Sequence, residues 1–351
     1  MANREHTRVI HIGDRVIGGG NPILIQSMTN TPTEDVQATT AQIRRLAAAG
    51  CQIVRVAVPT MAAAKAVGKI KEAIDLPLVV DIHFDYRLAL ECIAAGADKV
   101  RINPGNIGGA DRVKAVAQAC ARKNIPIRIG VNGGSLEKPL LAKYGGVTPQ
   151  ALVDSAFGHI ALLNRYDFDD ICISLKSSSV PITMGAYQLM HRQSNYPLHL
   201  GVTEAGTTRM GTLKSAAGIG GLLALGIGDT LRVTLTADPV EEIYAARDIL
   251  KAIGLRREGP DLIACPTCGR TKIDLIPLAQ EVEQRLKSVT KPITVAVMGC
   301  PVNGPGEAAA ADVGIAGGNG KGLLFRRGEV VKQAPQEALV DELMALIEAL
   351  P

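Results

Sequence analysis

The first three quarters of the chain alternate between short β-branched apolar runs and longer stretches rich in alanine, leucine and lysine. The short runs predict strands at Ile23–Met28, Gln52–Val58, Pro77–Ile82, Asp98–Ile102, Pro126–Val131, Asp170–Leu175, Pro197–Val202 and Thr230–Leu235. A predicted helix follows each strand, and these helices begin near Glu34, Thr60, Tyr86, Asp111, Thr148, Ile182, Thr212 and Pro239. Strands alternating with helices predict a parallel sheet, and eight such units in about 250 residues are typical of a closed (β/α)8 TIM barrel, an α/β fold.

An open, doubly wound sheet is the alternative arrangement of the same elements. Such a sheet usually has a glycine-rich phosphate turn after its first strand. Here the first strand ends in Gln26-Ser27-Met28-Thr29-Asn30, and the run Gly18–Gly20 precedes it. We therefore interpret Val9–Val16 as a small hairpin that leads through these glycines into a barrel domain spanning residues 1–253.

The pattern changes after Ile253. Residues 254–260 are charged and bounded by glycine and proline, as linkers are. Residues 261–351 combine predicted helices at Leu275–Leu286 and Gln336–Leu350 with predicted strands at Leu262–Ala264, Ile293–Met298 and Leu323–Phe325. This mixture predicts a small α+β domain.

Composition supports this organisation and narrows the function. The 351 residues are 47% hydrophobic and only 3% aromatic, which suits parallel strands buried on both faces. The net charge of +4 is too small for a dedicated nucleic-acid binder but is compatible with a small anionic ligand. No apolar leader and no apolar run of membrane-spanning length is visible, so we expect a cytoplasmic protein without a membrane partner. Its seven cysteines are then expected to be thiols or metal ligands rather than disulfides.

Barrel enzymes react at the carboxyl ends of their strands, so those ends are the place to look for chemistry. Here they carry Arg55, Asp81, His83, Arg101, Asn103, Arg128, Asn132, Lys176, Thr203, Glu204, Arg232 and Thr234. Some of the arginines are expected to pair with Asp81, Asp98 or Asp170, but the five cations outnumber the carboxylates at these ends. The surplus predicts a polyanionic substrate, most simply a phosphate or diphosphate. The long segment Gly133–Val147 is a candidate lid.

The smaller domain contains Cys265-Pro266-Thr267-Cys268 and, further on, Cys300. Three cysteines are too few for a zinc site with four cysteine ligands, and no histidine follows His199, which weakens a zinc interpretation. An iron–sulfur cluster is favoured, with Glu307 as the candidate fourth ligand. A carboxylate binds iron more weakly than a thiolate does, which suggests an iron that opens to substrate. Glu307 could instead be an acidic residue at a helix N-terminus. Cys51, Cys92, Cys120 and Cys172 are interpreted as core residues.

Several motifs together identify a family. The chain closely resembles 4-hydroxy-3-methylbut-2-enyl diphosphate synthase, the bacterial two-domain iron–sulfur enzyme of the methylerythritol phosphate route to isoprenoids. The resemblance covers nearly all of the chain and rests on Asp81–Phe84, Arg101–Gly108, Arg128–Asn132, Ser135–Lys138, Pro197–Gly201, Thr203–Gly206, Gly226–Val233, Ala264–Cys268, Gly299-Cys300 and Val302–Glu307.

The resemblance implies a domain like that of sulfite and nitrite reductases after the barrel, and a [4Fe–4S] cluster held by Cys265, Cys268, Cys300 and Glu307. It implies a reductive ring opening of 2-C-methyl-D-erythritol 2,4-cyclodiphosphate, with ferredoxin or flavodoxin as electron donor. Glu204 is then the candidate general acid, because the departing oxygen needs a proton. The chain departs from the family pattern at Ser177–Ser179, Pro301 and Thr234, and the first departure puts a partner of Lys176 in doubt.

Two other functions are compatible with the residues alone. One is a Schiff-base, class I aldolase-like barrel with Lys176 as nucleophile and a structural metal in the smaller domain. The other is a cluster-bearing sensor without enzymatic activity, against which the charged strand ends argue.

The linker predicts an assembly. Residues 254–260 span at most about 25 Å when extended, and they follow a helix that ends at the amino-terminal face of the barrel. The smaller domain would therefore reach the opposite, catalytic face of its own barrel poorly. A head-to-tail homodimer, which the family resemblance also implies, would let the smaller domain of one copy serve the barrel of the other.

Overall fold

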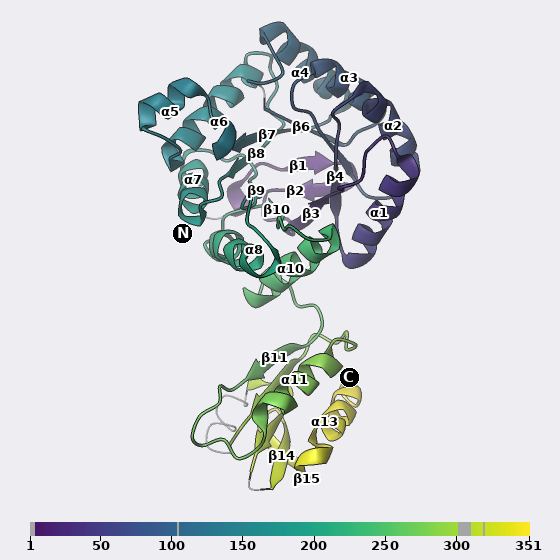
Figure 1. The fold of residues 1–351 in the computed structure, drawn as a ribbon, viewed down its shortest axis with the longest axis vertical. Coiled ribbons are helices and arrows are strands. Elements are labelled where there is room, and N and C mark those ends of the chain that lie inside the picture. Colours follow the sequence, from purple (N-terminus) through teal and green to yellow (C-terminus); the bar gives the residue numbers. More distant parts are fainter. Residues whose placement is uncertain (1–3, 104, 301–309, 319) are drawn as a thin grey trace. The chain divides into compact units, whose positions relative to one another are not determined.

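The computed structural model describes residues 4–351 except 104, 301–309 and 319. The chain divides into two compact units, Met1–Leu255 and Arg256–Pro351. Figure 1 shows the elements of each unit.

The larger unit is built on eight parallel strands in the order β8-β7-β6-β5-β4-β3-β10-β9. Their bounds are β3 Leu24–Met28, β4 Ile53–Ala57, β5 Leu78–Asp81, β6 Lys99–Ile102, β7 Ile127–Asn132, β8 Ile171–Lys176, β9 His199–Leu200 and β10 Thr230–Leu231. A parallel bridge between Ile173 and Leu198 joins the two ends of this order, so the strands form a ring. The predicted eight-stranded barrel is confirmed, and Figure 1 shows its helices around the outside.

The helices of the barrel follow their strands as the sequence predicts. They are α1 Val36–Ala49, α2 Met61–Glu72, α3 Tyr86–Ala94, α4 Ala110–Lys123, α5 Lys138–Tyr144, α6 Pro149–Asn164, α7 Val180–Gln193, α8 Thr208–Ser215, α9 Gly221–Ala224 and α10 Pro239–Ala252. Side-chain caps define where several of these helices begin. The Thr60 side chain accepts a hydrogen bond from Ala63 N at the start of α2, and the Thr148 side chain accepts one from Ala151 N at the start of α6. Two details differ from the prediction: α8 begins at Thr208 rather than near Thr212, and the segment Gly133–Val147 contains the short helix α5.

A hairpin closes the amino-terminal end of the barrel. Strands β1 (Ile10–Ile12) and β2 (Arg15–Ile17) pair antiparallel, as the sequence predicts. Their isoleucines pack with Leu24, Ile53, Val79 and Cys172, which come from the barrel strands. A Cβ atom at Gly18, whose φ is +79°, would lie 1.8 Å from the carbonyl oxygen of Arg8, so only glycine fits where the hairpin turns into the barrel. Because the apolar side chains of this hairpin cover the amino-terminal end, the carboxyl end of the strands is the end that opens to solvent.

The smaller unit is a five-stranded mixed sheet with two main helices. The strand order is β11-β12-β13-β14-β15, with bounds β11 Asp261–Ala264, β12 Thr294–Met298, β13 Val313–Gly317, β14 Lys321–Arg326 and β15 Glu329–Pro335. Helices α11 (Leu275–Leu286) and α13 (Leu339–Glu348) pack on its core. The predicted α+β unit is thus present, and the two strands that the sequence analysis does not predict are β13 and β15.

The core of the barrel, which is otherwise mostly apolar, contains a buried lysine. Lys99, at the start of β6, is fully buried, and its Nζ has no hydrogen-bond partner among the described residues. Burial lowers the pKa of this amine to about 8, and the neighbouring charges of Arg128 and Arg55 act in the same direction.

We expect Lys99→Met to stabilise the protein near neutral pH. One pKa unit corresponds to about 1.4 kcal/mol, so protonating Lys99 in the fold costs on the order of 3 kcal/mol. Because the folded-state pKa is depressed, this cost is fully present below about pH 8 and disappears as the pH rises towards the ordinary value of 10.5. Chemical denaturation should show a higher unfolding free energy for the variant at neutral pH, and a shrinking difference above pH 8. A difference that does not change with pH would contradict this explanation.

Candidate active site

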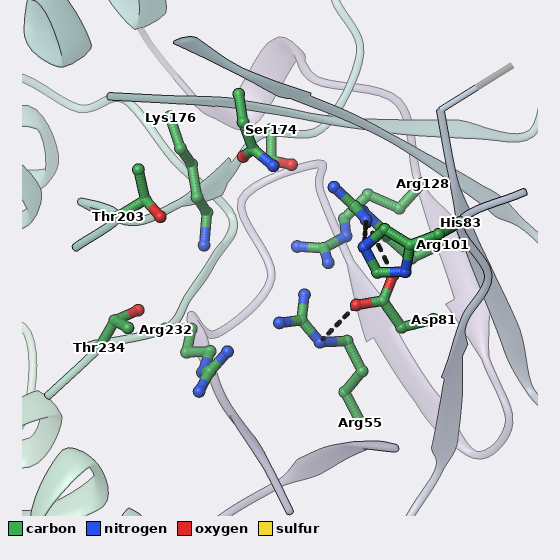
Figure 2. A pocket seen from close by; sticks show the side chains of 11 residues that line it. Arg55, Asp81, His83, Arg101, Arg128, Ser174, Lys176, Thr203, Arg232 and Thr234 are labelled. Carbon is green, nitrogen blue, oxygen red and sulfur yellow. Dashed lines mark hydrogen bonds and ion pairs between the residues drawn. The ribbon is translucent and has the colours of Figure 1, made fainter. Parts of the chain in front are cut away.

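The carboxyl ends of the barrel strands surround a polar cavity of about 160 Å³. Its lining residues are Arg55, Asp81, His83, Arg101, Arg128, Asn132, Ser174, Lys176, Thr203, Arg232 and Thr234. Figure 2 shows their side chains converging from neighbouring strands. Of the residues that the sequence places at the strand ends, all but Asn103 and Glu204 line this cavity. Ser174 is a further lining residue that the sequence analysis does not single out.

Asp81 anchors one side of the cavity. Its carboxylate accepts a hydrogen bond from Arg101 Nη1 at 2.9 Å and lies 3.7 Å from Arg55 Nε. His83 is beside the same pair, with its Nε2 3.2 Å from Arg101 Nη1. Burial alone would raise the pKa of Asp81, but the nearby charges, above all those of Arg55 and Arg101, lower it to about 2. Asp81 is therefore ionised and holds two arginines in place.

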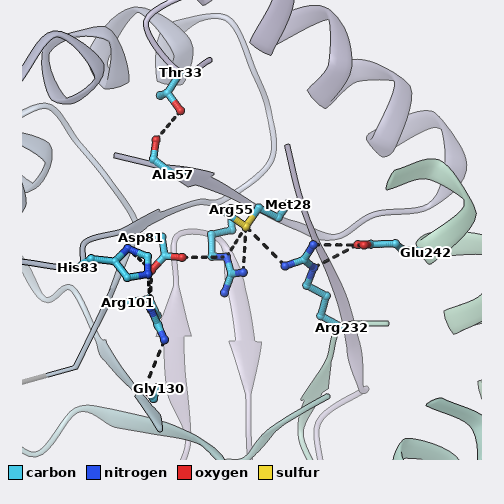
Figure 3. Close-up of polar contacts among 10 residues, drawn as sticks. All are labelled: Met28, Thr33, Arg55, Ala57, Asp81, His83, Arg101, Gly130, Arg232 and Glu242. Atoms are coloured by element: carbon cyan, nitrogen blue, oxygen red, sulfur yellow. Dashed lines mark hydrogen bonds and ion pairs between the residues drawn. The ribbon is translucent and has the colours of Figure 1, made fainter. Parts of the chain in front are cut away.

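A second carboxylate, which the sequence analysis misses, anchors the opposite side. Glu242 of α10 accepts hydrogen bonds from Arg232 Nε at 3.1 Å and from Arg232 Nη2 at 3.2 Å. Between the two anchored sides lies Met28, whose sulfur is 2.9 Å from Arg55 Nη2 and 3.5 Å from Arg232 Nη1 (Figure 3). A thioether is a weak acceptor without charge, so it separates the two guanidinium groups without neutralising either.

Lys176 and Arg128 are the two cations of the cavity that have no carboxylate partner among the described residues. Both are buried, and Nε and Nη1 of Arg128 lack a hydrogen-bond partner in the described part of the chain. Burial is the main cause that moves the pKa of Lys176 well below its usual range, and repulsion from Arg128 and the other arginines acts in the same direction. A Cβ atom at position 201 would lie 2.5 Å from Lys176 Nζ, so Gly201 makes room for the amine. These two side chains are the natural contacts for a bound anion.

A second cavity, of about 200 Å³, adjoins the first and shares His83, Arg101 and Asn132 with it. Its other lining residues are Ile82, Phe84, Asn103, Asn106 and Ser135. Asn103 therefore faces this compartment. Carboxamides, a hydroxyl and apolar side chains suit the hydroxylated carbon part of a ligand better than its charged part. Phe84, Asn106 and Ser135 belong to the family motifs, but no local pattern in the sequence marks them as cavity residues.

Glu204 lies at the mouth of the barrel, outside both cavities. It follows Thr203 on the loop after β9, is exposed, and has a φ of +51°. Left-handed backbone is uncommon for a residue with a side chain and occurs more often at functional sites than elsewhere.

Two of the candidate cluster ligands, Cys265 and Cys300, lie at the same end of the smaller sheet, and no three His, Cys, Asp or Glu side chains among the described residues form a group that could hold a metal ion. Cys265 directly follows β11 and Cys300 follows β12, its parallel neighbour. The backbone N–H of Gly299 donates to Cys265 Sγ at 3.1 Å, and a backbone hydrogen bond from Arg270 lowers the pKa of Cys268. Cysteine sulfurs that accept hydrogen bonds from backbone N–H groups fit an iron–sulfur cluster. Glu307 lies outside the described residues.

The remaining cysteines are buried, and all seven are free thiols. Burial raises the pKa of Cys51 to about 11 and that of Cys92 to about 12, as expected of core residues. None of the helices in the described part of the chain has the length and apolar character that crossing a bilayer requires.

The fold and the cavity define a two-domain protein with a (β/α)8 barrel whose mouth carries a surplus of cationic side chains. The family model for the GcpE TIM-barrel domain matches residues 7–247, and that for the GcpE protein C-terminal domain matches residues 261–349. The chain therefore belongs to the GcpE family.

Curated relatives agree with this assignment. A 4-hydroxy-3-methylbut-2-en-1-yl diphosphate synthase (flavodoxin) of Caldanaerobacter subterraneus subsp. tengcongensis is 58% identical over 347 residues, which cover 99% of this chain and 98% of the relative. The synthase of the same name from Clostridium perfringens is 58% identical over 99% of this chain and 100% of its own. Among solved structures, a dihydropteroate synthase from Stenotrophomonas maltophilia matches 70% of this chain and 97% of its own with a TM-score of 0.52 and 13% identity, which is a likeness of fold alone.

Anion binding should strengthen as the pH falls, because a bound anion favours the protonated form of Lys176. Sulfate tests this well, since its double charge does not change between about pH 6 and pH 9. Linkage allows up to about a tenfold gain in affinity per pH unit where Lys176 titrates. Calorimetry should show this slope in the unmodified protein and in Lys123→Met, an exposed control on α4, but not in Lys176→Met. A sulfate affinity that is independent of pH in the unmodified protein would contradict the role of Lys176 as a contact for a bound anion.

Proposed function

We propose that this chain catalyses the reductive ring opening of 2-C-methyl-D-erythritol 2,4-cyclodiphosphate to 4-hydroxy-3-methylbut-2-enyl diphosphate. The substrate dianion takes up two electrons and one proton, and yields the diphosphate trianion and water. The observation that carries the proposal is a pair of buried cations, Lys176 and Arg128, which have no carboxylate partner among the described residues and lie in the barrel mouth of a chain 58% identical to synthases of that name.

The two cavities suggest how the substrate is oriented. Lys176 and Arg128 would contact the diphosphate, and Arg55, Arg101 and Arg232, each fixed by a carboxylate, would complete its cationic surroundings. Asn132 lines both cavities and would contact the ligand where its charged part meets its carbon part. Asn103 and Ser135 would face the hydroxylated carbons, while His83 and Thr234 complete the walls. Three fixed arginines bind at a low entropic cost, because they are already oriented.

The smaller unit would supply the electrons. Cys265, Cys268, Cys300 and Glu307 would hold a [4Fe–4S] cluster, and its chemistry when bound is electron transfer and Lewis-acid activation of the leaving oxygen. The protein's own part is to hold Cys265 and Cys300 at the carboxyl ends of adjacent parallel strands and to direct the Gly299 N–H at the Cys265 sulfur. Glu307 is the ligand that we expect to exchange with substrate.

Glu204 is the proposed general acid. It lies at the rim of the mouth, directly after the cavity residue Thr203, and its exposed carboxyl group can exchange protons with water. The left-handed backbone of Glu204 turns the loop after β9 in a direction that a residue with extended backbone would not produce.

We further propose that flavodoxin is the electron donor, which the printed names of the relatives support. The free state of all seven cysteines supports a reducing, cytoplasmic location. We also propose a head-to-tail homodimer, supported by the short linker 254–260 and by its start at the amino-terminal face of the barrel.

The Schiff-base alternative would use Lys176 as a nucleophile, and the lowered pKa of that amine is compatible with it. The full-length identity to diphosphate synthases favours the reductive reaction instead. Burial of the amine, together with the charges of four neighbouring arginines, also explains the lowered pKa without any nucleophilic role.

The activity test is conversion of the cyclic diphosphate by the anaerobically purified protein with reduced flavodoxin, together with iron analysis. We expect bound iron, absorbance near 400 nm and the linear diphosphate as product. Cys265→Ser, Cys268→Ser and Cys300→Ser should each lose iron and all turnover, and Glu307→Ala should lose less iron. Cys120→Ala, a buried change in α4, is the control and should retain both iron and activity. Full iron content in all three serine variants, or borohydride trapping of substrate on Lys176, would refute the proposal.

Subunit complementation tests the shared site. Glu204→Gln and Cys300→Ser should each be inactive alone. A mixed dimer contains one site with an intact barrel and an intact smaller domain, so mixing the two should restore activity. If native mass spectrometry verifies the heterodimer and no activity returns, the site belongs to a single chain.

A further inference from the structure

Glu242 is an almost fully buried carboxylate at the edge of the candidate active site. It lies in the first turn of α10 and is 3% exposed, whereas its neighbour Glu241 is exposed. Ionised side chains are rarely buried to this extent without several partners, because burial removes them from water. A buried carboxylate at this position therefore requires hydrogen-bond partners around it.

Four hydrogen bonds satisfy its two oxygens. Oε2 accepts from Arg232 Nε at 3.1 Å and from Ser27 Oγ at 3.0 Å. Oε1 accepts from Arg232 Nη2 at 3.2 Å and from the backbone N–H of Leu235 at 3.2 Å. The pairing with Arg232 is bidentate, the geometry in which a carboxylate fixes the plane of a guanidinium group. Figure 3 shows this pairing, with Arg232 extending towards Met28 and Arg55.

The partners of Glu242 come from the two strands at which the barrel closes. Ser27 is on β3, the first barrel strand, while Arg232 and Leu235 follow β10, the last. These strands pair over only two residues, Thr230 with Leu24 and Leu231 with Ile25. The Glu242 carboxylate thus bridges a short seam and fixes a cavity arginine with the same two oxygens.

Among the described residues, Arg232 has no comparably strong partner on its other side. Its Nη1 is 3.5 Å from the Met28 sulfur, which is a weak acceptor. Across the cavity it faces other cations, since Arg232 is among the charges that depress the pKa of both Arg55 and Lys176. Repulsion from these groups would push an unanchored guanidinium out of the cavity wall.

We propose that Glu242 is a positioning residue: it holds Arg232 in the cavity wall against the repulsion of the neighbouring cations, so that the guanidinium is already oriented when the anionic substrate arrives. Glu242 touches no substrate itself. This role rests on the proposed function, because it assumes that Arg232 contacts the diphosphate. A carboxylate that served only to close the barrel would leave ligand binding unchanged wherever the fold remains intact.

A double-mutant cycle separates the two roles. The measurement is calorimetric binding of the cyclic diphosphate to the oxidised holoprotein, which cannot turn the ligand over without a reductant. We expect Arg232→Met and Glu242→Gln each to weaken binding about tenfold or more. The double variant should bind no more than about twofold more weakly than Arg232→Met alone, because Glu242 acts through Arg232. Glu241→Gln, the exposed neighbour, is the matched control and should bind like the unmodified protein.

Ser27→Ala keeps the carboxylate and removes one of its four hydrogen bonds, so it keeps the test valid if Glu242→Gln fails to fold. It should weaken binding less than Glu242→Gln, and this loss should vanish in the Arg232→Met background. Equal losses in the presence and absence of Arg232, or unchanged binding in both Glu242→Gln and Ser27→Ala, would overturn the positioning role. If the unmodified protein does not bind the cyclic diphosphate at all, the proposed function fails instead, and the two failures are distinguishable.

Discussion

Repulsion among buried cations is the constraint that organises the larger unit. Arg55, Arg101, Arg128, Lys176 and Arg232 all face one cavity, and Asp81 and Glu242 are the carboxylates paired with them among the described residues. Two anions cannot neutralise all of these charges in so confined a space. The remaining features accommodate this imbalance: an uncharged thioether lies between two guanidinium groups, a glycine makes room for the amine, and that amine has a lowered pKa.

The barrel tolerates this imbalance because the rest of its interior is conventional. β-branched and aliphatic residues fill the layer between strands and helices, and the hairpin residues Ile10, Ile12 and Ile17 close the amino-terminal end. The apolar packing stabilises the fold and leaves the carboxyl end with a surplus of positive charge. An anion is the ligand that relieves the surplus. The same imbalance that destabilises the empty site therefore favours a diphosphate over a neutral sugar.

The sequence is most informative where one pattern has one structural meaning. The barrel strands are predictable because most of them are buried apolar runs with β-branched residues, although β9 (His199–Leu200) and β10 (Thr230–Leu231) are shorter than the predicted runs. The cavity residues follow because parallel strands direct their carboxyl ends to one mouth. Short or atypical elements escape: α5 is only seven residues between glycine pairs, β13 is rich in glycine and alanine, and β15 is an edge strand with mostly exposed side chains. Glu242 escapes for another reason, since nothing local distinguishes it from Glu241.

The bridge between Ser27 and Glu242 also bears on how the protein is made. The two residues are 215 positions apart, so the contact forms only after nearly the entire barrel has left the ribosome. Until then β3 has an unpaired edge and Arg232 has no anchor. A barrel closed by so distant a pairing has a large loop-closure entropy to overcome, and contacts of this kind are typical of slow folding. The nascent chain is therefore exposed to misassociation, and to chaperones, for longer than a protein built from local contacts.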